Sequence, residues 1–418
     1  MSSASLGSGV LRVFAAAAVL CAAAGASRVN AAAAPSRRNV VLIILESVRS
    51  DHVGAYGYSR DTTPNMDALA REGVLFKRHF CNSTWTPPSV ATLLTGQFMD
   101  THGITGYSDN VWERSRRRIF EFLSAKGYRV SHRRVEQAPD SKDPVPELLG
   151  WMQEDERRPF FLVVQLLDSH VPYRCPKQFQ ERFAPKQSDI LDQKEKELSL
   201  HDYLLWLVES RVHGDTPVLR HMIAHYDGSI AYVDDQIGRL RAGMEAHDLL
   251  GSTHLIIVGD HGESLDEAGR FLTHGDGSFC ESMLRVPLIW RPPGGCTGRT
   301  LDFFSGHTDV LPTLFAWLGI PAPDWFQGKD LSAWMRGERK DVPEYWIYGS
   351  EVHVGKWIWM FRDRKWKCVF NAMQSKAFLY DLEQDPQETK NLVKSKPELV
   401  FALAAKVLEK RQALIRAR

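Results

Sequence analysis

The feature that most constrains the fold is an unbroken apolar run, Asn39-Val-Val-Leu-Ile-Ile-Leu45, which is rich in β-branched residues. A strand with one face in water would alternate apolar and polar residues, so this run predicts a central strand buried on both faces. The runs at 160–167 and 254–258 predict two more strands of this kind, and 285–290 a fourth. Helix-like stretches at 64–72, 87–94, 226–244 and 309–318 alternate with them, which predicts an α/β sandwich with a mostly parallel sheet.

The residue pattern of the chain changes near Pro321. Residues 346–370 are aromatic-rich and partly alternating, as antiparallel strands are, and 397–417 has the pattern of a terminal amphipathic helix. We therefore expect a main domain over 35–320 and a small C-terminal αβ subdomain over 321–418. The polar, charge-dense segment 187–214 is interpreted as an insertion or mobile loop within the main domain.

The first 34 residues differ from the rest. Arg12 precedes a small-residue apolar run from Val13 to Ala26, and Ala-rich sequence continues to Ala34. This is the shape of a signal peptide, so residues 1–34 predict export to the periplasm or the medium. An uncleaved N-terminal membrane anchor is the alternative.

Composition excludes some classes of partner. The formal net charge is +1, so no overall positive field points to nucleic acid. No segment after residue 34 approaches 18 consecutive apolar residues, so no membrane span is expected beyond the signal. The sequence leaves the oligomeric state open.

Acidic and histidine side chains follow three of the predicted strands. Glu46 follows the first, Asp168-Ser169-His170 the second, and Asp260-His261 the third. The carboxyl ends of parallel strands meet at one edge of a sheet, where ligands bind, so these side chains are expected to converge. Carboxylate and imidazole ligands suit a divalent ion such as Mn, Zn or Ca.

Several stretches resemble the sulfatases of the alkaline phosphatase/sulfatase superfamily. Thr84-Trp85-Thr86-Pro87-Pro88-Ser89, with Leu93-Leu94-Thr95-Gly96 behind it, is similar to the sulfatase signature Cys-x-Pro-Ser-Arg and its trailing Leu-Leu-Thr-Gly. The matching stretches occur in the family's order between about Asn39 and Val393; the others are 39–58, 226–240, 259–263, 285–289 and 379–386. The resemblance implies an alkaline-phosphatase-like sandwich and hydrolysis of an anionic ester.

The departures from the family pattern are specific. Thr86 replaces the signature cysteine that such enzymes oxidise to formylglycine, so no formylglycine is expected. Val90 replaces the signature arginine, and Glu46-Ser47 stands where paired aspartates are usual. The set Glu46, Thr86, Asp260 and His261 resembles the superfamily's threonine-nucleophile branch, which implies that these four residues hold one divalent ion, with Mn favoured.

The chemistry expected of Thr86 also follows from its place in the chain. A threonine hydroxyl is a weak nucleophile until its proton is removed, and a metal ion or a helix N-terminus stabilises the resulting anion. Thr86 immediately precedes a helix that opens with two prolines. The alternative is that Thr86 only caps that helix.

Histidines complete the predicted site. By resemblance, His170 and His274 are the candidates for binding the anionic ester. His307 and Asp309 are interpreted as a helix cap rather than as ligands, while Asp51, Asn82 and Ser89 are candidates for supporting roles.

The sequence thus predicts a metal-dependent hydrolase of sulfate- or phosphate-type esters with Thr86 as nucleophile. A formylglycine hydrate can release sulfate by collapsing to its aldehyde, whereas an esterified threonine needs a second attack at sulfur or phosphorus. That difference favours phosphoester or phosphonate over sulfate ester. A phosphoglycerol-type phosphotransferase and a catalytically inactive, sulfatase-shaped binding protein are the alternatives.

Overall fold

The apolar run at 39–45 forms β1 (Asn39–Leu45), in the interior of the main sheet. The computed structural model describes residues 38–107, 110–136, 143–173, 175–184, 199, 202, 216–265, 274–275, 277–353, 356–372 and 375–416. β1 pairs in parallel with β4 (Phe160–Leu166) on one side and with β5 (Thr253–Gly259) on the other. Every residue of β4 and β5 is buried, which confirms the three central strands predicted from their largely apolar sequences.

The main sheet has seven strands in the order β3-β4-β1-β5-β6-β2-β7. The remaining strands are β2 (Val74–Phe80), β3 (Arg129–Val135), β6 (Leu288–Arg291) and β7 (Arg299–Gly306). Only β6 runs against its neighbours, pairing antiparallel with β5 and β2. The prediction of a mostly parallel sheet is confirmed. The strand predicted at 285–290 begins three residues later, at Leu288, and is the antiparallel one.

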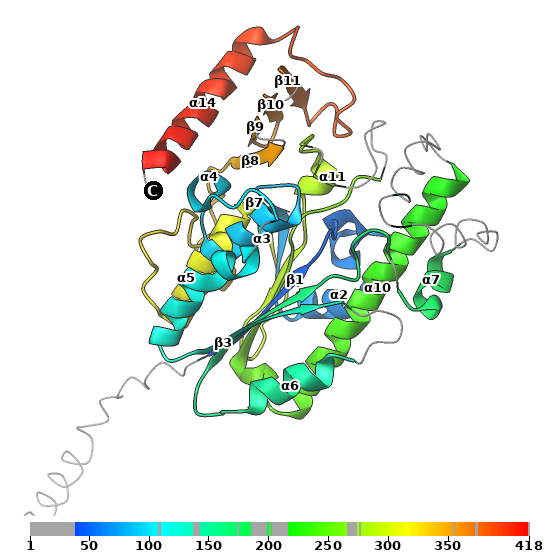
Figure 1. Ribbon diagram of the computed structural model, residues 1–418, viewed down its shortest axis with the longest axis vertical. Helices are drawn as coiled ribbons and strands as arrows, with labels where there is room; N and C mark the ends of the chain where they lie inside the picture. The colour runs from blue at the N-terminus through cyan, green and yellow to red at the C-terminus, as the bar shows by residue number, and fades with distance from the viewer. Residues whose placement is uncertain are drawn as a thin grey trace, which may run out of the picture. The chain divides into compact units, whose positions relative to one another are not determined.

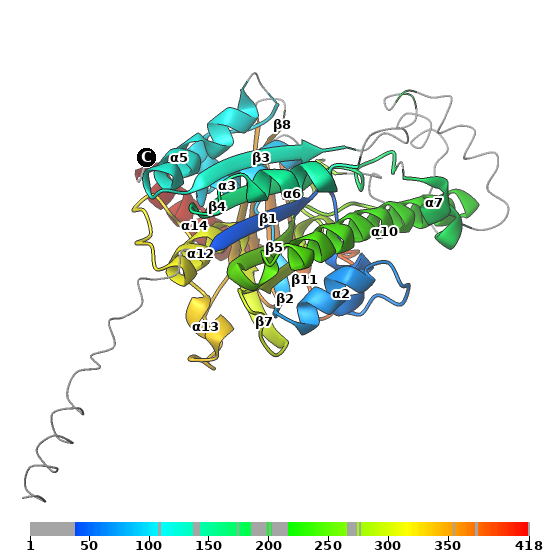
Figure 2. The same ribbon diagram turned by 90° about the horizontal axis from the view of Figure 1, so that it is seen from below.

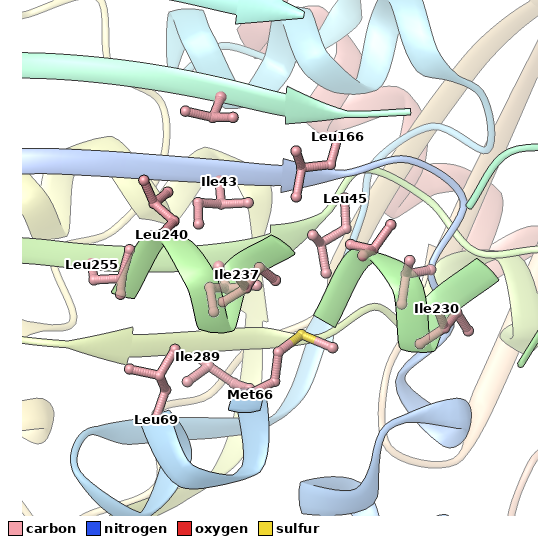
Figure 3. Close-up of a cluster of buried hydrophobic side chains, with 14 of the residues drawn as sticks. Ile43, Leu45, Met66, Leu69, Leu166, Ile230, Ile237, Leu240, Leu255 and Ile289 are labelled. Atoms are coloured by element: carbon pink, nitrogen blue, oxygen red, sulfur yellow. The ribbon is translucent and has the colours of Figure 1, made fainter. Parts of the chain in front are cut away.

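One face of the sheet is covered by three helices, α2 (Pro64–Arg71), α6 (Val145–Gln153) and α10 (Pro217–Ala246). Alternate residues of β1, including Ile43 and Leu45, meet Ile237 and Leu240 of α10 in this layer (Figures 2 and 3). Each fully buried side chain of this size contributes about 1.5–3 kcal/mol through removal from water. The layer therefore fixes the strand ends from which the site side chains project.

The opposite face is covered by α3 (Thr86–Thr95), α5 (Val111–Ala125) and α12 (Val310–Leu318), with the short α13 (Ser332–Arg336) beside them. The other alternate residues of β1, such as Leu42 and Ile44, pack here against Leu93 and Leu314. Helices on both faces make a three-layer α/β sandwich, as predicted.

A second, four-stranded antiparallel sheet lies near the C-terminus, in the order β11-β10-β9-β8. Its strands are β8 (Ile347–His353), β9 (Lys356–Arg362), β10 (Trp366–Asn371) and β11 (Lys376–Asp381), and α14 (Pro397–Arg416) covers it (Figure 1). Leu403 and Val407 of α14 share an apolar cluster with Phe98 of the main domain. The small sheet and terminal helix were predicted; the domain boundary near residue 320 stays a prediction.

Three short α-helices, α4 (Met99–His102), α7 (Lys177–Phe183) and α11 (Glu281–Leu284), are also described, as are 3-10 helices at Ser50–His52, Gly54–Tyr56, Leu250–Ser252 and His307–Asp309. Within the described part of the chain, no helix is long and apolar enough to cross a membrane. The predicted signal at 1–34 lies outside the described residues, as does the segment 187–214 apart from 199 and 202.

Candidate active site

The ends of β1 and β5 bring three predicted site residues together. The Asp260 amide donates to the Leu45 carbonyl at 2.9 Å, so the two chains leave the sheet side by side. Asp260 Oδ1 then accepts the backbone N–H groups of Ser47 at 2.9 Å and His261 at 2.7 Å. Ser47 has a φ of 61°, a left-handed conformation that turns the backbone sharply after Glu46. These bonds fix the Asp260 carboxylate beside Glu46 and His261.

Thr86 reaches the same point from the other side. It is the first residue of α3 and is 1% exposed, with Pro87 and Pro88 in the first turn, where their missing N–H groups cost nothing. Its Oγ1 lies 3.0 Å from Glu46 Oε1 and 3.1 Å from His261 Nε2. The N-cap of α3 is Trp85, and no side chain makes a cap hydrogen bond there. The Thr86 side chain is therefore turned toward Glu46 and His261 rather than toward the helix backbone.

The protonation of His261 follows from its surroundings. Its Nδ1 lies 2.8 Å from the Gly262 carbonyl, which can only accept, so Nδ1 carries the proton. Nε2 then has its lone pair directed at Thr86. Burial, together with the nearby His274, lowers the pKa of His261 well below its ordinary value. A neutral imidazole of this tautomer can accept a proton or bind a metal ion.

This cluster contains more hydrogen-bond acceptors than donors. Besides the Thr86 contacts, Glu46 Oε2 and Asp260 Oδ2 are buried and have no hydrogen-bond partner. Burial and the neighbouring Glu46 carboxylate raise the pKa of Asp260 well above its ordinary value. Thr86 supplies one proton to share between two acceptors, so ionisation of both carboxylates is unfavourable here unless a cation lies beside them.

The spacing of these atoms also suits a cation. His261 Nε2 and Asp260 Oδ2 lie 3.5 Å apart, beside the Thr86 contacts of 3.0 and 3.1 Å. Ligand atoms at about 2.1 Å from one ion stand roughly 3.0 Å apart in octahedral and roughly 3.4 Å apart in tetrahedral geometry. However, no group of three or more His, Cys, Asp or Glu side chains among the described residues is positioned to hold a metal ion. The metal role of these residues therefore stays a proposal.

The two histidines predicted to bind substrate lie next to this cluster. The His274 ring centre is 4.4 Å from that of His261 and 4.9 Å from that of His170. Burial alone would lower the pKa of His274, but the Glu263 carboxylate, 3.2 Å from Nδ1, more than offsets this, and the pKa is raised. His170 Nδ1 lies 2.6 Å from the Val171 carbonyl, which directs its other ring nitrogen elsewhere. His274 thus offers positive charge beside the predicted nucleophile.

Tyr107 belongs to this site but was not predicted. Although 60% of its surface is exposed, burial of the hydroxyl end and the charge of Glu46 raise its pKa to about 12, and its phenol interacts with Thr86. Its ring packs edge-to-face on Trp85 at 6.0 Å and on Trp112 at 6.2 Å. A lone tyrosine before a helix gives no sequence signal, since only the fold brings it to Thr86.

A second layer holds the metal-ligand candidates in place. Ser89, one turn into α3, donates to the Asp260 carbonyl at 2.5 Å and lies 3.1 Å from His307 Nδ1. His307 Nε2 donates to the Gly259 carbonyl at 3.0 Å, and burial lowers the pKa of His307 to about 3. His307 therefore supports the end of β5 in addition to opening the turn before α12. Asp309 stands at the N-cap position of α12 but makes no side-chain cap bond to that helix; its carboxylate instead accepts the Gly306 N–H at 2.8 Å in the preceding turn.

The loop before Thr86 is held by the C-terminal small sheet. Glu351, a fully buried residue of β8, accepts hydrogen bonds from the Thr84 N–H at 2.8 Å and the Thr84 hydroxyl at 2.7 Å. Asn82 donates to the Tyr348 carbonyl of the same strand at 2.7 Å, so its role is to join the two sheets. Asp51, the other supporting candidate, pairs with Arg49 at 2.8 Å.

Solved structures with the same architecture are sulfatases and related hydrolases. A protein solved in complex with its substrate D-glucosamine-2-N,6-O-disulfate superposes with a TM-score of 0.73, at 18% identity over 90% of this chain and 98% of that one. The phosphonate monoester hydrolase of Agrobacterium radiobacter gives a TM-score of 0.68, at 22% identity over 90% of this chain and 96% of that one. At this level of identity the likeness shows the fold, which is the alkaline-phosphatase-like α/β sandwich of these hydrolases.

The sequence comparison is more specific. The sulfatase family model matches residues 38–139 and 132–320, and the model of the N-sulphoglucosamine sulphohydrolase C-terminal region matches 276–413. An arylsulfatase of Clostridium perfringens is 24% identical over 85% of this chain and 90% of its own length. A choline-sulfatase of Rhizobium meliloti is 28% identical over 58% of this chain and 48% of its own length. The chain belongs to the sulfatase family.

Proposed function

We propose that this protein is an exported, metal-dependent hydrolase of sulfate- or phosphate-type esters that uses Thr86 as its nucleophile. The observation that carries the proposal is the position of the Thr86 hydroxyl, within hydrogen-bond distance of both Glu46 and His261 at the first residue of α3. Members of this superfamily generally use a divalent metal ion. Glu46, Asp260, His261 and Thr86 are the residues that would hold it.

The first step is attack of Thr86 Oγ1 on sulfur or phosphorus. Its proton passes to Glu46 Oε1 or His261 Nε2, the two acceptors at 3.0 and 3.1 Å. A new O–S or O–P bond forms as the bond to the leaving alcohol oxygen breaks, and that oxygen takes up a proton. Water then attacks the same sulfur or phosphorus, the bond to Thr86 Oγ1 breaks, a proton from the water restores the Thr86 hydroxyl, and the sulfate, phosphate or phosphonate product leaves.

Several parts of the chain stabilise negative charge at this point. A divalent ion, when bound, supplies Lewis-acid stabilisation of the nucleophile and of the ester oxygens. The N-terminus of α3 contributes a positive partial charge beside Thr86. His274, whose pKa is raised by Glu263, adds a full charge over a wider pH range than a free histidine would. His170 lies against His274 and is the second candidate contact for the ester.

Phosphoester or phosphonate is the favoured substrate class. Hydrolysis of the threonine ester requires a second displacement at sulfur or phosphorus, which phosphorus undergoes more readily. The relatives fit either class: the curated ones include arylsulfatases, and a multifunctional alkaline phosphatase superfamily protein of Trinickia caryophylli is 23% identical over 85% of this chain. Turnover of an aryl sulfate, a phosphate monoester, a diester and a phosphonate by the purified protein separates the classes.

The nucleophile is tested with Thr86→Ala, Thr86→Ser and a matched control, Thr95→Ala, in the last turn of the same helix. Thr86→Ala should lower kcat by on the order of 10⁴-fold or more, because the attacking oxygen is gone. Thr86→Ser keeps that oxygen and should retain part of the activity. Mass spectrometry should find the sulfuryl or phosphoryl group on the Thr86 peptide of the wild type. Near wild-type turnover by Thr86→Ala would show that the proposed mechanism is wrong.

Export is tested separately. N-terminal sequencing of secreted or periplasmic protein should place the first residue between about 27 and 35, since the small-residue sites end at Ala26 and Ala34. A chain that keeps Met1 and sediments with membranes would support the anchor instead.

A further inference from the structure

A large cavity opens between the main domain and the C-terminal small sheet. Its volume is about 680 Å³, within the range of about 300–1,000 Å³ that is usual for small-molecule sites. α11 forms part of its wall and lies between the small sheet and the core in Figure 1. None of the six predicted site residues lines it. The cavity is distinguished by six basic residues in its wall: Arg49, Lys77, Arg78, Arg285, Arg362 and Arg364. We call it the basic cavity.

Three of these cations are already neutralised by carboxylates. Arg49 pairs with Asp51 at 2.8 Å, Arg78 with Asp302 at 2.6 Å, and Arg362 with Glu281 at 2.7 Å. Glu388, the remaining acid of the wall, is an ion-pair partner of the buried Lys367. Each of the three described acids that line the basic cavity therefore has a cation of its own.

The other three cations have no such partner in the part of the chain that the structure describes. Within the described residues, no carboxylate lies at ion-pair distance from Lys77, Arg285 or Arg364. Arg285 donates from Nη2 to the Lys77 carbonyl at 2.9 Å, but its Nε is buried and has no hydrogen-bond partner. A buried guanidinium donor without an acceptor is costly, so a negative charge near Arg285 is favoured.

We propose that the basic cavity is an anion-binding site, separate from the Thr86 centre, that takes a sulfate, phosphate or carboxylate group. Arg285 contributes a guanidinium charge with an unpartnered N–H at Nε, and Arg364 and Lys77 add charge from the exposed side. The group is supplied either as a free anion or as part of a larger polyanionic molecule, since both present the same oxygens.

The basic cavity lies next to Glu263, the residue that holds His274, which is predicted to bind substrate. Arg49 Nη1 donates to the Glu263 carbonyl at 3.2 Å, and the Glu263 carboxylate holds His274. Arg49 is thus shared between the wall of the cavity and the backbone behind the catalytic cluster. An anion bound there would lie one residue layer from that cluster without touching it.

Lys77 provides a local test that does not use turnover. Purified mature protein is acylated with an N-hydroxysuccinimide ester in potassium phosphate and in potassium chloride of equal ionic strength, and the Lys77 peptide is followed by mass spectrometry. At a phosphate concentration about ten times Kd, labelling of Lys77 should slow about tenfold, because the site is then mostly occupied. Lys340, exposed elsewhere on the surface, is the internal control and should label equally in both salts. Equal rates at Lys77 would overturn the proposal.

Two variants test whether the protection of Lys77 comes from an anion bound in the basic cavity. Arg364→Gln removes an exposed cation and should weaken protection of Lys77 by about tenfold in Kd, the effect of losing one charge-assisted contact. Arg117→Gln is the control, because Arg117 is exposed and pairs with Glu121 on α5. Undiminished protection in Arg364→Gln would overturn the proposal. Thr86→Ala should be protected like the wild type, so the result is independent of the proposed function.

Two further measurements of Lys77 labelling distinguish a free anion from one group of a larger molecule. Inorganic sulfate is compared with a sulfated disaccharide at equal sulfate concentration. Protection of Lys77 by both supports a site for free oxyanions. Protection by the disaccharide alone supports a site for one group of a larger substrate. Protection by neither, with none from phosphate, would refute an anion site.

Discussion

The bond between Glu351 and Thr84 makes a sharp prediction about how the C-terminal small sheet supports catalysis. Both Thr84 hydrogen bonds, at 2.8 and 2.7 Å, end on the same oxygen of a carboxylate that is fully buried. A hydrogen bond to a charged group contributes about 1.5–3 kcal/mol and one to a neutral group about 0.5–1.5 kcal/mol. Glu351→Gln should therefore lower the free energy of unfolding by roughly 2–3 kcal/mol over the two bonds.

Activity should fall further than stability alone explains. Thr84 is two residues before Thr86, so loosening it shifts the hydroxyl relative to Glu46 and His261. A misplacement of about 1 Å can cost on the order of 10²-fold in rate. The assays are urea unfolding and kcat at saturating substrate, with the exposed Glu344→Gln from the same subdomain as the control.

A double-mutant cycle with Thr84→Val isolates the pair. If the two side chains act on each other, the two losses should be non-additive by about 1–2 kcal/mol. Additive losses, or a Glu351→Gln protein as active and stable as Glu344→Gln, would refute the reasoning that β8 positions the nucleophile.

Three further predictions address the site itself. Dialysis against a chelator should abolish turnover and lower Tm, and Mn should restore both; an ion at a hundred times its Kd adds about 2.7 kcal/mol of stability. Unchanged activity in chelator would exclude a metal role for Glu46, Asp260 and His261. Glu263→Gln should lower the pKa of His274, because the carboxylate that raises it is lost. Since neutral His274 no longer attracts the anionic ester, the rise in KM with pH should begin at lower pH than in the wild type. An NMR titration of His274 showing no shift would contradict this. Gly262→Ala should unfold the protein or reduce its activity severely, since a Cβ there would stand 1.9 Å from the Ser282 carbonyl oxygen. Circular dichroism and turnover measure these effects, and wild-type behaviour would contradict the geometry around His261.

The parts of the fold that the sequence predicted are those with a local physical signal. β1, β4 and β5 are buried on both faces, so their residues are mostly apolar, with Gln165 in β4 and Thr253 and His254 in β5 as buried polar exceptions. β3 has no such signal: Arg129–Val135 is largely polar because it lies at the edge of the sheet. The direction of β6 depends on its pairing with β5 and β2, which are distant in sequence, and no local pattern encodes it.

The same distinction holds for the site. Glu46, Asp260 and His261 could be grouped because each directly follows a recognisable strand, and the structure brings them to Thr86. Tyr107 and Glu351 could not be found in this way, since each reaches the site only through contacts across the fold. His307 was interpreted as a cap, and its bond to the Gly259 carbonyl depends on how α12 packs.

The loop from Asn82 to Thr86 has a consequence for how the protein denatures. It is hydrogen-bonded to β8 at one end and begins α3 at the other, while α14 packs on Phe98 just beyond that helix. The small sheet therefore cannot come apart without freeing the segment that carries the nucleophile, and the main domain cannot melt without exposing the apolar face under α14. Heating should give one calorimetric transition for residues 38–416, with inactivation following the same curve. Proteolytic loss of the terminal helix should accordingly end catalysis, although every residue proposed to act on the ester lies far upstream of it.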